Sequence, residues 1–215
     1  MTDTMIEIYL DPICPWCLIG KRRLDHALVM AKKARPEASY DLRWRVFQLN
    51  PTMPTEGMDR AAYLATKFGG FERAHEVYDV IQREGLKEGI EFAFDRIRRT
   101  PNTLAAHGLI RLAQSNGHSS SLVERLFEAY FIEGLDIGDD QILMEIAKST
   151  GLDPEQVQSF FAGDRAVDSL AAEDAAARAL GITGVPFFII NKQYSVSGAV
   201  APEVLLRALE LSWQS

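Results

Sequence analysis

The two cysteines of this chain, Cys14 and Cys17, are separated by Pro15 and Trp16. An apolar segment precedes the pair and a helical pattern follows it, which places Cys14 at the start of a helix. There the unpaired amide groups of the first turn and the positive end of the helix dipole stabilise a thiolate. Cys17, one turn later, could attack a mixed disulfide formed on Cys14. The pattern predicts a redox pair in which Cys14 is the more exposed, attacking thiol.

A zinc site, a structural disulfide and ordinary core packing are the alternatives to redox chemistry for this pair. A structural zinc site needs four ligands, but His26, His75, His107 and His118 are dispersed along the sequence, so we expect no metal. A structural disulfide between cysteines three positions apart would close only a small loop and stabilise little. Two ordinary core cysteines would not require this position between a strand and a helix. Redox chemistry is therefore the favoured interpretation.

Trp16 allows two interpretations that the sequence leaves open. It could pack as an ordinary surface aromatic residue. It could also offer a flat apolar contact to an incoming polypeptide or thiol substrate, because an indole gives a large contact area at a low entropy cost.

The elements that must position the cysteines alternate between strands and helices at both ends of the chain. Short apolar or alternating runs predict strands, and apolar residues at helical spacing predict helices. A block rich in Ala, Leu, Glu and Arg lies between these ends and predicts several helices. The expected strands are 5–10, 40–49, 186–190 and 193–197. The expected helices are 15–34, several within 55–149 with visible starts near Asn102, Ser119 and Asp139, one beginning near Asp153, one from about Asp164 to Leu180, and 202–213.

A second motif, Gly184-Val185-Pro186-Phe187-Phe188, opens the third expected strand. Together with the Cys-Pro-Trp-Cys motif it resembles the thioredoxin superfamily, and the helical block after the second strand is similar to the DsbA branch. The resemblance narrows to FrnE-type DsbA-family oxidoreductases, which share their fold with 2-hydroxychromene-2-carboxylate isomerases and kappa-class glutathione transferases. Further stretches that carry it are 11–17, 47–51, 102–107, 130–134, 179–186 and 197–199.

This resemblance implies an α/β protein with a thioredoxin-like domain at about 1–50 and 163–215, interrupted by an all-helical insertion at 51–162. It also implies that Cys14 attacks, that Cys17 resolves and that Pro186 is a cis-proline facing them. Val185 would present backbone groups to an extended substrate.

Four further residues receive weaker expectations. Asp11, three positions before Cys14, would cap its turn rather than assist proton transfer to Cys17. Asn50 and Ser197 lie near segments that contact glutathione in the transferase relatives, although ordinary turn roles are favoured. His107 lies on an apolar helix face, where a buried, hydrogen-bonded histidine is the default interpretation.

The leading functional hypothesis is a dithiol-disulfide oxidoreductase acting on protein or small-molecule thiols and disulfides. The alternative is a glutathione-dependent isomerase or transferase. Those relatives typically carry serine where this chain has Cys14, so two cysteines favour redox chemistry. A holdase that uses the helical block as an apolar groove is a third class, and its binding would survive replacement of both cysteines.

Composition limits the partners. The 215 residues include 23 basic and 30 acidic side chains, giving a net charge of −7, which disfavours nucleic acid as a partner.

No apolar run is long enough for a membrane span, and residues 1–11 lack a secretory signal, so a cytoplasmic location is expected. The cytosolic glutathione poise would keep the pair reduced, which favours a reductase or isomerase. We expect no tightly bound cofactor, glutathione as reductant or co-substrate, and a monomer or homodimer.

Overall fold

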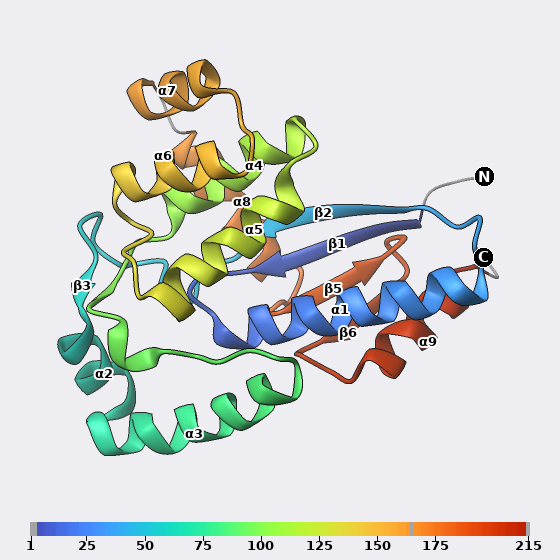
Figure 1. The fold of residues 1–215 in the computed structure, drawn as a ribbon, viewed down its shortest axis with the longest axis horizontal. Coiled ribbons are helices and arrows are strands. Elements are labelled where there is room, and N and C mark those ends of the chain that lie inside the picture. The colour runs from blue at the N-terminus through green and yellow to red at the C-terminus, as the bar shows by residue number, and fades with distance from the viewer. Residues whose placement is uncertain (1–3, 164–165, 214–215) are drawn as a thin grey trace.

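The computed structural model describes residues 4–163 and 166–213, so residues 1–3 and the expected helix start at Asp164 lie outside the described residues. Strands at both ends of the chain flank a long helical region (Figure 1). The elements are β1 (Thr4–Leu10), α1 (Pro15–Ala34), β2 (Tyr40–Val46), β3 (Met58–Asp59), α2 (Arg60–Phe68), α3 (Phe71–Lys87), a 3₁₀ turn (Phe94–Arg96), β4 (Arg99–Thr100), α4 (Leu104–Ser115), α5 (Ser119–Glu128), a π-helical turn (Ala129–Glu133), α6 (Asp140–Ser149), α7 (Pro154–Ala162), α8 (Val167–Ala179), β5 (Phe187–Ile190), β6 (Tyr194–Ser197) and α9 (Pro202–Ser212).

The main sheet has four strands in the order β2-β1-β5-β6. β1 and β2 are parallel, with Ile8 opposite Trp44, whereas β5 is antiparallel to β1, with Ile8 opposite Phe188. The antiparallel register also pairs Tyr9 with Phe187. The end of β1, which leads to Cys14, therefore lies beside the beginning of β5, which follows Pro186.

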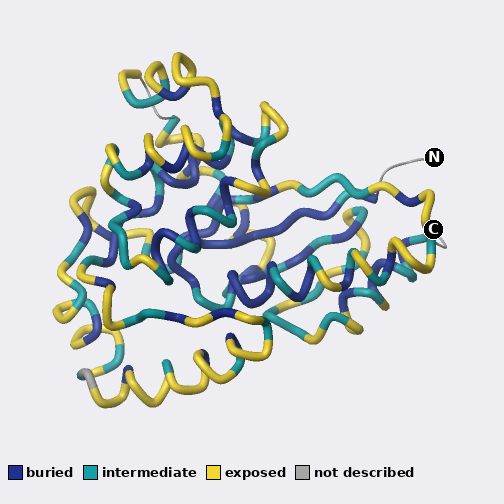
Figure 2. The backbone as a smooth tube through the Cα atoms, in the orientation of Figure 1, coloured by how far each residue is buried: buried dark blue, intermediate teal, exposed yellow. Residues whose placement is uncertain are grey.

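Apolar side chains cover both faces of this sheet because residues alternate along each strand. Ile6, Ile8 and Phe188 belong to the main core, which includes side chains of α1 and α9. These two helices lie side by side against the sheet (Figure 1). Tyr9 faces the opposite side and packs with Ala177 of α8. β1 and the first half of α1 are largely buried (Figure 2). The cysteine pair thus lies between two largely buried segments.

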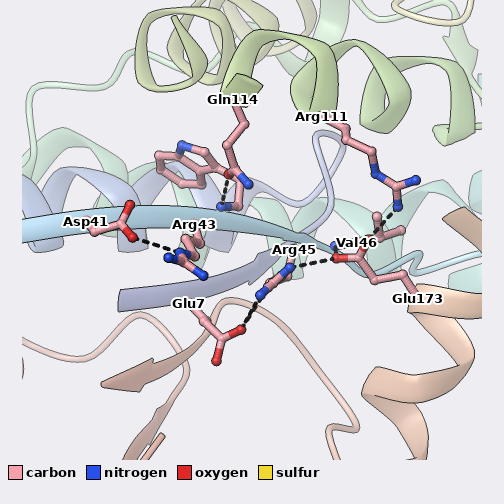
Figure 3. Close-up of polar contacts among 9 residues, drawn as sticks. Glu7, Asp41, Arg43, Arg45, Val46, Arg111, Gln114 and Glu173 are labelled. Atoms are coloured by element: carbon pink, nitrogen blue, oxygen red, sulfur yellow. Dashed lines mark hydrogen bonds and ion pairs between the residues drawn. The ribbon is translucent and has the colours of Figure 1, made fainter. Parts of the chain in front are cut away.

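Strand β2 forms one edge of the sheet, and side chains from α4 and α8 cover that edge (Figure 3). The Trp44 backbone N–H donates to Gln114 Oε1 at 2.7 Å, and the Val46 N–H donates to Glu173 Oε1 at 3.3 Å. Just beyond the strand, the Gln48 N–H donates to Asp174 Oδ1 at 2.7 Å. An exposed edge invites pairing with another chain, so these acceptors satisfy the edge and also anchor the helices to it.

Arg23 of α1 connects the insertion to the rest of the chain. Its guanidinium lies 2.7 Å from Glu84 of α3 and 2.7 Å from Glu88, just after that helix. It also donates to the Ala199 carbonyl oxygen at 2.5 Å. Because Arg23 is buried, this three-way contact fixes α3 against α1 and against the loop before α9.

The expected order of strands and helices agrees with the structure, but the insertion is not all-helical as expected. β3 and β4 pair antiparallel inside it, with Met58 opposite Thr100 and Asp59 opposite Arg99. Two residues per strand are too few to produce an alternating pattern, so the sequence carried no strand signal there. The second strand also ends at Val46 rather than at 49, because from Gln48 onward the backbone bonds to α8 and Asp11 instead of a strand.

Among the described residues, none of the helices combines the length and the apolar character that crossing a membrane requires.

Candidate active site

Cys14 is the N-cap residue of α1, and Pro15 occupies the first helical position, where its missing N–H is not needed. The Cys14 N–H donates to the Asp11 carbonyl oxygen at 2.9 Å, which closes the turn between β1 and the helix. The Cys17 N–H donates to the Cys14 carbonyl oxygen, also at 2.9 Å. Cys14 therefore lies at the N-terminus of α1, the position expected from the sequence, but its side chain accepts no hydrogen bond from the N–H groups of the first turn.

Cys14 was expected to be the more exposed thiol, but both cysteines are buried. The exposed fractions are 4% for Cys14 and 2% for Cys17. The loop that ends at Pro186 covers Cys14, which explains its low exposure. The two thiols interact with each other and are not joined in a disulfide. Burial, and then the neighbouring Cys14, raise the pKa of the Cys17 thiol. Cys17 therefore needs a nearby proton acceptor before it can act as a nucleophile.

The loop before β5 brings the second motif against Cys14. The Cys14 Sγ donates to the Val185 carbonyl oxygen at 3.5 Å, and the Val185–Pro186 peptide bond is cis. The Pro186 carbonyl oxygen accepts a hydrogen bond of 2.8 Å from the Gly198 N–H, which anchors this loop to the end of β6. Two segments 171 positions apart in sequence thus meet at one sulfur atom.

Gly20 of α1 packs directly on the Pro186 ring. A Cβ atom at Gly20 would lie 2.6 Å from Pro186 Cγ and 3.2 Å from Pro186 Cβ. Since 2.6 Å is far below a normal carbon–carbon contact, only glycine fits there without movement. This contact sets how closely α1 approaches the Pro186 loop and therefore where Cys14 lies relative to Val185.

The Asp11 carboxyl group is fully buried beneath the pair. It accepts a hydrogen bond from the Leu49 N–H at 2.7 Å and one from the Ile13 N–H at 3.3 Å, and the Thr103 hydroxyl also interacts with it. Burial outweighs these bonds and raises the pKa of Asp11 to about 7. Asp11 therefore caps its turn, as expected, and it also carries an acid that titrates near neutral pH.

Trp16 and Asn50 lie close to this centre. Trp16 is half-buried and packs against the main core. Asn50, one residue after Leu49, bonds through its side chain to the Tyr63 hydroxyl at 3.3 Å and to Lys67 Nζ at 3.3 Å. Its carbonyl oxygen also accepts the Met53 N–H, an ordinary turn contact. Asn50 thus connects the segment beside Asp11 to α2.

His107 and Ser197 lie farther from the sulfur atoms. His107 is buried, its Nε2 lies 3.2 Å from the Phe47 carbonyl oxygen, and burial lowers its pKa to about 4. It is therefore a neutral, hydrogen-bonded core histidine. Ser197 is exposed at the end of β6, opposite Phe187 in register. Among the contacts of the described residues, none joins either side chain to Cys14 or Cys17.

Sequence reasoning missed Gly20, Leu49 and Thr103 as parts of the site. Gly20 left a signal, because an isolated glycine inside a helical pattern indicates a close approach by another segment. Leu49 contributes a backbone N–H, which no side-chain pattern reveals. Thr103 is brought to Asp11 only by the fold of the insertion.

Substitution Gly20→Ala is predicted to destabilise the protein by about 1–3 kcal/mol, because the added methyl group overlaps the rigid Pro186 ring. The helix propensity of alanine recovers at most about 1 kcal/mol of this. Urea unfolding measures the change. Gly184→Ala is the matched control, since a Cβ atom at Gly184 would have no neighbour within 4 Å, and it should change stability little. Equal effects of the two substitutions would contradict the packing argument.

Asp11 should make stability fall as pH rises from about 4 to about 7. Its pKa is raised from 3.8 to about 7, so in this window the folded state holds a proton that the unfolded state has released. The effect is on the order of 4 kcal/mol at most, and Asp11→Asn should remove it. His107 acts in the opposite direction, because its lowered pKa costs stability as pH falls below 6.5, but it is common to both proteins. If the unfolding free energies of the wild type and of Asp11→Asn change with pH in the same way across this window, the pKa of Asp11 is not raised in the folded state.

Comparison with known proteins agrees with this geometry. Residues 5–210 match the model of the DSBA-like thioredoxin domain family. An uncharacterized protein of Bacillus subtilis, YwbO, is 26% identical over 211 residues, covering 95% of this chain and 94% of that protein. The crystal structure of a probable DsbA oxidoreductase, SCO1869 from Streptomyces coelicolor, has 31% identity and a TM-score of 0.86, covering 99% of this chain and 91% of that chain.

More distant structures share the fold alone. A 2-hydroxychromene-2-carboxylate isomerase has 14% identity and a TM-score of 0.71, with coverage of 98% of this chain and 96% of the isomerase. The cytosolic disulfide reductase DsbM from Pseudomonas aeruginosa, solved with GSH, has 19% identity and a TM-score of 0.66, with coverage of 98% and 100%. With its thioredoxin-like sheet and helical insertion, the chain belongs to the DSBA-like thioredoxin domain family.

Proposed function

We propose that the protein is a dithiol-disulfide oxidoreductase that exchanges disulfides with protein or small-molecule thiols through Cys14 and Cys17. The observation that carries the proposal is the contact of the helix-capping Cys14 sulfur with the Val185 carbonyl oxygen at 3.5 Å, with Cys17 one turn behind it. Membership of the DSBA-like family and the similarity to a probable DsbA oxidoreductase support it.

The exchange proceeds in two steps. The Cys14 thiolate attacks one sulfur of a substrate disulfide, forms a mixed disulfide and releases the other substrate sulfur as a thiolate. Cys17 then loses its proton and attacks Cys14 Sγ, which releases the second substrate sulfur and leaves a Cys14–Cys17 disulfide. Two electrons pass from the dithiol to the substrate. An external thiol reductant, such as two molecules of glutathione, returns the pair to the dithiol.

Asp11 is the group that accepts the Cys17 proton in the second step. Cys17 is buried and its pKa is raised, so hydroxide in bulk solvent has poor access to it. The Asp11 carboxyl group interacts electrostatically with Cys17, and its own pKa of about 7 suits proton exchange near neutral pH.

The backbone of Val185 and the ring of Trp16 contact the substrate in this proposal. An extended substrate segment could pair with the polar backbone groups of Val185, because a peptide binds a free backbone edge as an added strand. Trp16 is half-buried beside the attacking cysteine and offers an apolar contact that requires no particular substrate sequence.

We infer that the enzyme works as a reductase with glutathione as its reductant in the cytoplasm. The similarity in fold to a cytosolic disulfide reductase solved with GSH supports this direction. A reducing cytosol also favours the dithiol form, which is the form that can donate electrons.

Cys14→Ser should abolish reduction of a disulfide-bonded peptide, because the attacking sulfur is lost. Cys17→Ser should still form a mixed disulfide but should not release it, and mass spectrometry of the intact protein will detect the added peptide. The two variants therefore differ in kind, and each serves as the control for the other.

Sustained turnover by either single variant would refute the two-thiol mechanism. Failure of Cys17→Ser to trap a peptide, while Cys14→Ser does trap one, would reverse the roles of the two cysteines.

A further inference from the structure

A cavity of about 520 Å³ lies within the insertion, between α2, α3 and residues 94–98. Cavities that bind small molecules in proteins usually have a volume of about 300–1,000 Å³. Leu64 and Ala74 are buried in its wall, and Phe94 and Ile97 complete an apolar side. None of its lining residues contributes to the Cys14 site, so the cavity is separate from the proposed redox centre.

The Phe94 ring makes this wall rigid. It stacks on Tyr78 with a centroid distance of 4.3 Å and on Phe92 with a centroid distance of 4.9 Å. Both faces of the Phe94 ring are therefore covered, and only its edge is available to a ligand. Fixed rings of this kind give a preformed apolar surface rather than one that has to reorganise on binding.

Arg60, the first residue of α2, brings a positive charge to the cavity. Its guanidinium donates to the Thr100 hydroxyl at 3.0 Å and to the Tyr78 hydroxyl, and it lies over the rings of Tyr63 and Tyr78. Within residues 4–163 and 166–213, the ion pairs include no carboxylate partner for Arg60, and its buried Nε has no hydrogen-bond partner. Arg60 is half-buried, and partial removal of a guanidinium from water without a counter-charge is costly, so the site favours an anion that supplies one.

Other charged side chains at the cavity favour an anion with a single negative charge. Asp59 and Asp95 line it together with Arg98 and the exposed His75, and Asp59 already caps α2 through the Ala62 N–H. The two aspartates balance two arginines, so the lining has no surplus positive charge to pair with a ligand that carries several negative charges. A single carboxylate, in contrast, can pair with Arg60 and the Tyr78 hydroxyl.

We propose that this cavity binds a small organic monocarboxylate with an apolar body. The carboxylate forms a charge-assisted pair with Arg60, and the body packs against Leu64, Ala74 and the edge of Phe94. This site is independent of the thiol chemistry, so its test stands whether or not the oxidoreductase proposal holds.

Hydrocinnamate is the probe, and its neutral isostere hydrocinnamamide is the matched control ligand. Titration calorimetry on the full chain should show saturable binding of one hydrocinnamate per protein. The amide should bind at least tenfold more weakly, because it lacks the charge that Arg60 pairs with. Absence of saturable binding, or equal affinity for the acid and the amide, would overturn the proposal.

Two variants test the location. Arg60→Gln should weaken hydrocinnamate binding at least tenfold, and Ala61→Trp should do the same by filling the cavity without changing charge. Ala62→Trp adds the same bulk at the neighbouring exposed position, which does not line the cavity, and should leave binding unchanged. Cys14→Ser should also leave it unchanged. Because Arg60 also supports Thr100, Ala61→Trp decides the outcome if Arg60→Gln does not fold, and undiminished binding by Ala61→Trp would exclude this cavity.

Discussion

The buried carboxyl group of Asp11 holds together three segments that are distant in sequence. One oxygen accepts the N–H of Leu49, just after β2, and the other accepts the N–H of Ile13 in the turn before α1. The Thr103 hydroxyl, at the start of α4, adds a contact from the insertion. A buried carboxyl group without these donors would be costly, so its presence forces the three segments to meet. The contacts of Asp11 therefore fix the position of the turn that carries Cys14.

The sheet register then aligns the two halves of the site. Because β5 runs antiparallel to β1 with Tyr9 opposite Phe187, the residue before β5 must arrive where β1 ends. Gly20 makes that close approach possible, because any side chain at this position would push α1 away from Pro186. The distance between Cys14 and Val185 is therefore a product of strand pairing and helix packing together, rather than of the motifs themselves.

Much of this could be predicted from the sequence because the signals were local. Helix α1 coincides with its expected bounds, and the N-caps Asp139 and Asp153 were visible as polar residues before a helical pattern. The burial of Cys14 could not be predicted, because it depends on a loop 171 positions away. The pairing of β3 with β4 was missed for a related reason: its partners lie about 40 residues apart and each contributes only two residues. Backbone donors such as the Leu49 N–H leave no trace in residue type.

The contacts of Gln48 have a consequence for how this architecture tolerates change. The chain departs from the sheet at Gln48, and on its return α8 bonds to the same residue: Asp174 accepts its N–H, and Arg178 donates to its carbonyl oxygen. Arg178 also lies 4.4 Å over the Phe47 ring, so the departing and returning segments are clamped side by side. Doubling the length of a closed loop adds only about 0.6 kcal/mol of closure entropy. Closure entropy alone therefore opposes a longer intervening region only weakly, provided that this clamp, the Thr103 contact, the Gln114 contact with β2 and the contacts of Glu84 and Glu88 with Arg23 are kept.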